Sequence, residues 1–161
     1  MTRQPTGVGR TARTARVLLA EDDDDIRMEL AEALAADGYL VIEARDGDEF
    51  LNSLIDAVPE QQSLRAYDAI ITDVVMPGFS GIDVLLALRR STAFIPVILV
   101  TAYADERTMR AAERLGVVAL FRKPFDLNEI LGVLATSLSR DAAATPSTRP
   151  PIITNGPRKL R

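Results

Sequence analysis

Five side chains stand directly after apolar runs and could together act on a phosphoryl group: Glu21, Asp22, Asp73, Thr101 and Lys123. The chain contains no cysteine and no histidine, which excludes thiolate sites, histidine-ligated metals and a phosphohistidine carrier within it. Carboxylates, hydroxyls and lysine are left for any reaction. The lysine stands out because the chain has 17 arginines and only two lysines. Its compact ammonium suits contact with a single phosphoryl or carboxylate oxygen.

If Glu21, Asp22 and Asp73 meet at one place, their like charges require a counter-ion. A set of carboxylates, a backbone carbonyl and waters is a site for a hard cation, and partial ligation by protein favours Mg²⁺ over Ca²⁺. With a lysine and a hydroxyl nearby, the natural chemistry is phosphoryl transfer to a carboxylate. We expect Asp73 to be the acceptor, because the loop that follows it, 74–81, contains the proline and two glycines of a tight turn.

The elements that must position these residues alternate regularly along the chain. Short apolar runs predict strands, and apolar residues at helical spacing predict the helices between them. The predicted strands are 17–20, 40–44, 69–72, 97–100 and 117–121, and the predicted helices run from residue 24 to the turn at Gly38 and over 48–58, 82–88, 105–115 and 127–138. Five such βα units predict an α/β fold of three layers, with a parallel sheet covered by helices on both faces.

In an open parallel sheet, ligands bind beyond the carboxyl ends of the strands, where the strand order reverses. The five reactive residues all follow strand ends. A strand can end in a polar residue simply because the chain reaches the surface. Four strand ends with complementary chemistry nevertheless favour a common site.

Charge is distributed unevenly between the body and the two tails. Residues 1–15 carry three arginines and no acid, and 141–161 carry four bases and one acid, which leaves 12 bases and 22 acids between them, a net charge of −10. Such a body disfavours nucleic acid binding by the core. We expect a disordered basic arm over 1–15, one folded domain over 16–139 and a disordered, proline-rich basic tail over 140–161. No apolar stretch is long enough to span a membrane, and a cytoplasmic location is expected.

Residues 16–138 resemble the receiver domains of two-component response regulators, the chemotaxis-type, CheY-like superfamily. The resemblance rests on four motifs: VLLAEDD at 17–23, YDAIITD at 67–73 with Met76-Pro77-Gly78 and Gly81, VILVTA at 97–102, and Lys123-Pro124-Phe125. It implies a flavodoxin-like (βα)5 sandwich whose five-stranded parallel sheet has the order 2-1-3-4-5.

The resemblance also implies roles for the site residues. Glu21, Asp22, Asp73 and the backbone carbonyl of Val75 would bind Mg²⁺. Asp73 would be phosphorylated from a histidine of a partner kinase or phosphotransfer protein, and Thr101 and Lys123 would contact the phosphoryl group. In this family the Lys-Pro peptide bond is cis.

Three features differ from the usual receiver pattern. The family places an aromatic switch residue three positions before the lysine, where this chain has Leu120. We therefore expect a packing switch that involves Thr101, Tyr103 and Leu120 in place of a ring rotation. Residues 59–66 resemble an insertion, and the aliphatic side chain of Val75 predicts moderate to slow loss of the phosphoryl group.

The expected function is that of a stand-alone receiver, not an enzyme, which signals to a downstream protein by phosphorylation-gated contact. The resemblance adds a homodimer through the face formed by the fourth helix, fifth strand and fifth helix. Two alternatives remain: a pseudo-receiver that binds a partner without phosphorylation, and an aspartyl-phosphate hydrolase. The hydrolase is disfavoured because such enzymes usually carry a second aspartate two residues after the nucleophile, where this chain has Val75.

Overall fold

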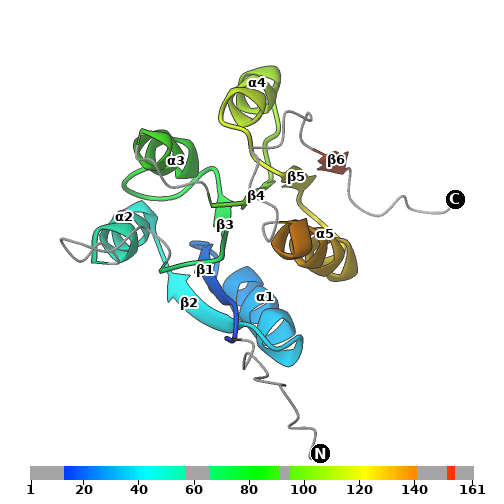
Figure 1. Ribbon diagram of the computed structural model, residues 1–161. Helices are drawn as coiled ribbons and strands as arrows, with labels where there is room; N and C mark the ends of the chain where they lie inside the picture. The colour runs from blue at the N-terminus through cyan, green and yellow to red at the C-terminus, as the bar shows by residue number, and fades with distance from the viewer. Residues whose placement is uncertain (1–12, 57–65, 91–94, 141–151, 155–161) are drawn as a thin grey trace, which may run out of the picture.

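The computed structural model describes residues 13–56, 66–90, 95–140 and 152–154 as a parallel sheet between two layers of helices (Figure 1). The strands are β1 (Arg16–Ala20), β2 (Leu40–Ala44), β3 (Ala69–Asp73), β4 (Val97–Thr101), β5 (Ala119–Arg122) and β6 (Ile152–Thr154). The helices are α1 (Asp24–Ala36), α2 (Gly47–Asp56), α3 (Gly81–Arg89), α4 (Glu106–Arg114) and α5 (Leu127–Arg140).

The sheet has the order β2-β1-β3-β4-β5-β6, and every neighbouring pair is parallel. The predicted flavodoxin-like fold and the order of the first five strands are confirmed. The prediction of five strands is wrong, because β6 adds a sixth on the outer edge of β5, pairing Ala119 with Ile152 and Phe121 with Thr154.

The sixth strand comes from the segment predicted to be the tail. Residues 152–154 are ordered as a strand, whereas the rest of the expected tail, 141–151 and 155–161, lies outside the described residues. The edge of β5 offers unpaired backbone groups, and the Ile-Ile-Thr segment consists of β-branched residues that favour strands. Composition alone missed this pairing because the tail as a whole has few large apolar residues.

The end of the predicted basic arm is also ordered. The Arg13 guanidinium pairs with the Asp68 carboxylate at 2.6 Å, and the Ala15 carbonyl accepts a hydrogen bond from the Leu40 N–H. Residues 1–12 of that arm lie outside the described residues, as do residues 57–65, which hold most of the predicted insertion.

Alternation along the strands builds a core on each face of the sheet. Figure 1 shows α1 and α5 on one face and α2, α3 and α4 on the other. In β1, Val17 and Leu19 pack toward α1 and α5, while Leu18 and Ala20 belong to the opposite cluster. Because helices cover both faces, the central strands β1, β3 and β4 are almost continuously apolar, and their polar residues stand at or next to the strand ends.

The helices begin at capping residues close to the predicted boundaries. Asp23 accepts a hydrogen bond from the Ile26 N–H at the start of α1, Ser80 and Asp83 form a capping box at α3, and Asp105 caps α4. None of the helices in the described parts of the chain is both long and apolar enough to span a membrane.

Candidate functional site

The five predicted residues meet at the carboxyl edge of the sheet. Asp73 and Thr101 are the last residues of β3 and β4, Glu21 and Asp22 follow β1, and Lys123 follows β5. Strand order reverses between β1 and β3, so this edge is the topological switch point at which such folds bind ligands. Carboxylate oxygens of Glu21, Asp22 and Asp73 lie within 4.8 Å of one another.

Lys123 joins two of these carboxylates. Its Nζ lies 2.6 Å from Asp73 Oδ2, 2.8 Å from Glu21 Oε2 and 3.0 Å from Glu21 Oε1. Glu21 and Thr101 are fully buried and Asp73 is nearly so, whereas Asp22 is exposed. The site is therefore a pocket with buried acids at its base and one acid at its rim.

Backbone contacts hold the carboxylates in place. Asp73 Oδ1 accepts a hydrogen bond from the Val75 N–H at 3.0 Å, and Glu21 Oε1 accepts one from the Asp23 N–H at 3.2 Å. Gly81 brings α3 against the acceptor strand, because a Cβ at this residue would lie 2.1 Å from the Asp73 carbonyl oxygen. Gly78 has a φ of +77°, and at this turn the loop packs against the start of α2, where the Gly47 N–H donates a hydrogen bond to the Pro77 carbonyl.

Burial and neighbouring charges set the ionisation of the pocket. Burial raises the pKa of Glu21 to about 7, the hydrogen bond from Lys123 opposes this shift, and the charge of Asp73 adds to it. Burial alone would lower the pKa of Lys123, but its hydrogen bonds to Asp73 and Glu21 outweigh burial and raise it. The pocket thus holds a charged ammonium and one carboxyl that resists ionisation.

The donor set fits Mg²⁺. Three carboxylates converge, and no hydrogen bond from the described residues reaches the buried Glu21 Oε2, although Lys123 Nζ stands beside it as an ion-pair partner. An all-oxygen site with an exposed member at its rim leaves room for the waters that Mg²⁺ retains. The types of these residues and their spacing therefore fit a divalent cation.

The predicted switch residues occupy different environments. The Thr101 hydroxyl accepts a hydrogen bond from the Tyr103 N–H at 3.1 Å. The Tyr103 side chain is 72% exposed, while Leu120 is fully buried in the core beneath α2, α3 and α4. Thr101 is thus linked to the backbone of the loop after β4, and the two other residues lie apart at the surface and in the core.

Two further observations concern the loops. The Lys123-Pro124 peptide bond is cis, as the resemblance implied. Val75 directs its N–H to Asp73, and its side chain is exposed at the mouth of the site.

Arg27 is a positioning residue that the sequence reasoning missed. It is buried on α1, and its Nη1 donates a hydrogen bond to the Glu21 carbonyl at 2.9 Å. Its guanidinium also pairs with Asp24 and with Glu43, whose Oε2 lies 3.2 Å from Nε. The available signal was its spacing, since Arg27, Leu30 and Leu34 share one helical face and all three are buried.

Comparison with known proteins agrees with this geometry. The family model described as "Response regulator receiver domain" matches residues 17–135. The chain is 34% identical to the transcriptional regulatory protein PdtaR of Mycobacterium tuberculosis over 137 residues, 84% of this chain and 62% of PdtaR. It is 35% identical to the regulatory protein AtoC of Escherichia coli over 71% of this chain and 23% of AtoC. The chain thus spans less than two thirds of these relatives.

Solved structures agree as well. A response regulator receiver domain protein from Clostridium thermocellum superposes with a TM-score of 0.70 at 25% identity, covering 80% of this chain and 97% of that one. The chemotaxis protein CheY4 of Vibrio cholerae gives a TM-score of 0.66 at 28% identity, covering 77% and 98%.

Proposed function

Because the chain belongs to the response regulator receiver family, we propose that it accepts a phosphoryl group on Asp73 from a histidine kinase or phosphotransfer protein. Receiver domains are signalling proteins, and they bind Mg²⁺ at an acidic pocket. The observation that supports the proposal most directly is the bridge from Lys123 to both Glu21 and Asp73, with Asp22 at the rim.

In the proposed reaction, Asp73 attacks the phosphorus atom of a phosphohistidine on the donor protein. A P–O bond to Asp73 forms, the P–N bond breaks, and its electron pair stays on the donor nitrogen. Glu21, Asp22, Asp73 and the Val75 carbonyl would hold Mg²⁺, which supplies positive charge beside the phosphoryl oxygens when bound. The Lys123 ammonium, 2.6 Å from the acceptor carboxylate, moves onto a phosphoryl oxygen and neutralises part of its charge.

Thr101 then links phosphorylation to the loop after β4. Its hydroxyl is bonded to the Tyr103 backbone, so turning it toward the phosphoryl group releases that loop. We infer a switch in which Tyr103 and the packing around Leu120 rearrange without a rotating aromatic ring. The side chain of Val75 is aliphatic and exposed, which supports moderate to slow hydrolysis of the aspartyl phosphate.

The proposed output is phosphorylation-gated contact with another protein, in the cytoplasm where ATP-dependent kinases act. A homodimer through α4, β5 and α5 belongs to the same proposal. Since β6 pairs with residues 119–121 along the edge of β5, a dimer on this face must include β6 or displace it.

The test is phosphorylation with acetyl phosphate in the presence of Mg²⁺, followed by intact mass measurement and peptide mapping. One phosphoryl group on Asp73, absent in Asp73→Asn and absent with EDTA, is the expected result. Thr101→Ala is expected to leave the modification site unchanged and to slow labelling. Continuous phosphate release without a stable label would indicate a hydrolase, and no label at all would indicate a pseudo-receiver.

A further inference from the structure

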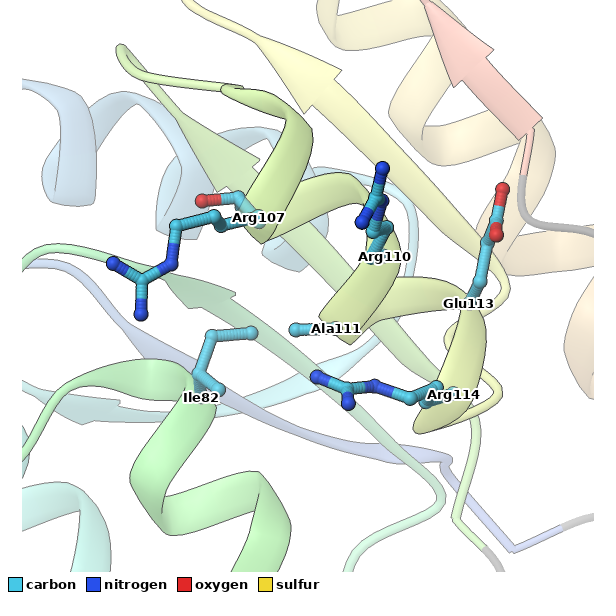
Figure 2. Close-up of a pocket in the computed structure, with 7 residues that line it drawn as sticks. Ile82, Arg107, Arg110, Ala111, Glu113 and Arg114 are labelled. Carbon is cyan, nitrogen blue, oxygen red and sulfur yellow. The ribbon is translucent and has the colours of Figure 1, made fainter.

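A groove between α3 and α4 is lined by three arginines and one glutamate. It has a volume of about 590 Å³ and is lined by Ile82 from α3 and, from α4, by Arg107, Thr108, Arg110, Ala111, Glu113 and Arg114. Figure 2 shows the guanidinium groups of Arg107 and Arg114 extending toward the Ile82 side, while the Glu113 carboxylate points away from it.

The three guanidinium groups differ in their ion pairing. Arg110 pairs with Glu106 one turn earlier on the same helix. Within the described residues, no ion pair engages Arg107 or Arg114. The groove therefore presents two guanidinium groups outside any ion pair of the described residues, with Asp105 close enough to Arg107 to interact with its charge, on a body that is otherwise strongly acidic.

These arginines are not needed to hold α4 in place. Ala112 is the buried residue of the helix, and the arginine side chains are exposed. Arg89, the last residue of α3, contacts the C-terminal end of α4, since its Nε donates a hydrogen bond to the Leu115 carbonyl at 2.8 Å. The charge of the groove can therefore serve binding without a role in packing.

We propose that this groove binds a short acidic segment of a partner protein. Arg107 and Arg114 are seven residues apart, about 10 Å along the helix axis. A peptide in the polyproline II conformation has three residues per turn and a rise of about 3.1 Å per residue, so two acidic residues three positions apart share one face about 9 Å apart. The apolar strip of Ile82 and Ala111 between the cations then accepts an apolar side chain from between the two acids.

A protein segment fits the groove better than nucleic acid does. The body of the chain has 12 bases against 22 acids, so a long polyanion that extends beyond the groove meets negative charge. A segment of four or five residues stays within the groove. The proposal does not depend on phosphoryl acceptance, because the groove is formed in the unmodified protein.

The test is fluorescence anisotropy with the full chain and labelled peptides in which Glu-Leu-Ala-Glu is flanked by Gly and Ser. One matched peptide replaces both Glu residues with Gln, and a second places the two Glu residues one residue apart. A twelve-nucleotide oligo-dT tests whether any polyanion binds. We expect the Glu peptide to bind at least tenfold more tightly than every other probe.

The double variant R107Q/R114Q should lose at least tenfold in affinity for the Glu peptide. Arg45→Gln is the control, because Arg45 is exposed and lies away from the groove. Circular dichroism and thermal melting establish that each variant folds. Equal binding of the Glu and Gln peptides, tighter binding of oligo-dT, or an equal loss in Arg45→Gln would overturn the proposal. Because no phosphodonor is used, these outcomes are independent of whether Asp73 is phosphorylated.

Discussion

The carboxyl edge of the sheet and the α4 helix hold their charges in opposite ways. At the sheet edge, Glu21 and Asp73 are buried at strand ends and fixed by Lys123 and by backbone N–H groups. On α4, the arginines are exposed on a helix of which Ala112 is the buried residue. The charges proposed to act on the phosphoryl group are thus mostly buried at strand ends, whereas the charges proposed to bind a partner lie on the surface, where substitution should cost little stability.

The largest expected effect comes from crowding the backbone beside the acceptor. Gly81→Ala puts a Cβ 2.1 Å from the Asp73 carbonyl oxygen, and neither backbone can move without shifting β3 or α3. We expect a loss of about 3 kcal/mol in the free energy of unfolding, measured by urea denaturation.

Gly132→Ala on α5 is the matched control, because nothing described lies within 4 Å of its Cβ. This substitution should stabilise the protein by roughly 0.5–1 kcal/mol, since alanine favours a helix interior. If the two substitutions gave the same change, the close approach at Gly81 would not constrain the site.

The pH dependence of the free energy of unfolding should distinguish the buried carboxyl of Glu21 from the exposed charges on α4. The folded-state pKa of Glu21 is about 7 and its ordinary value is 4.5, so the metal-free folded protein holds a proton that the unfolded chain releases. Between about pH 4.5 and 7 this group therefore lowers the free energy of unfolding as pH rises, by a total on the order of 3 kcal/mol.

The contribution of Glu21 is measured as the difference between wild type and Glu21→Gln in urea denaturation without metal from pH 5 to 8. Mg²⁺ should stabilise the wild type more at pH 8 than at pH 5, because binding requires the ionised carboxylate. A difference that stays constant over this range would show that the buried carboxyl does not titrate there.

A third contrast concerns two arginines that both pair with acids. Arg27→Met leaves the buried Glu21 carbonyl without its hydrogen bond, which we expect to cost about 1–3 kcal/mol and to weaken Mg²⁺ binding. Arg110→Met removes an exposed pair with Glu106 and should cost less than about 0.5 kcal/mol. Denaturation and Mg²⁺ titration of both variants check this order, and a larger cost for Arg110 would reverse it.

The residues of the pocket were predictable because each follows an apolar run that could only be a buried strand. The carboxyl ends of parallel strands lie at the same edge of the sheet. Glu21, Asp73 and Lys123 are therefore neighbours there, although Glu21 and Lys123 are 102 residues apart in the chain. The position of these residues after apolar runs, together with the rule that parallel α/β sheets bind ligands at the carboxyl ends of their strands, was sufficient to predict this part of the site.

Two features depended on tertiary packing and were not predictable in the same way. Arg27 was not identified from the sequence, yet on α1 it donates a hydrogen bond to the Glu21 carbonyl. Ile152–Thr154 looked like part of a disordered tail, but the edge of β5 supplies its hydrogen-bonding partner. The strand propensity of this three-residue segment is weak in isolation, but pairing with β5 is enough to make it a strand.

The smallest expected effect tests that last strand. Ile153→Pro removes the backbone N–H at the residue paired with Leu120, and we expect a stability loss of about 0.5–1 kcal/mol. Hydrogen exchange should become faster in β5 and stay unchanged in β3, which lies inside the sheet and is the internal control. If β6 also limits dimer formation through α4, β5 and α5, this variant should show more dimer in sedimentation experiments. Unchanged exchange in β5 would mean that the pairing with residues 152–154 does not protect the edge of the sheet.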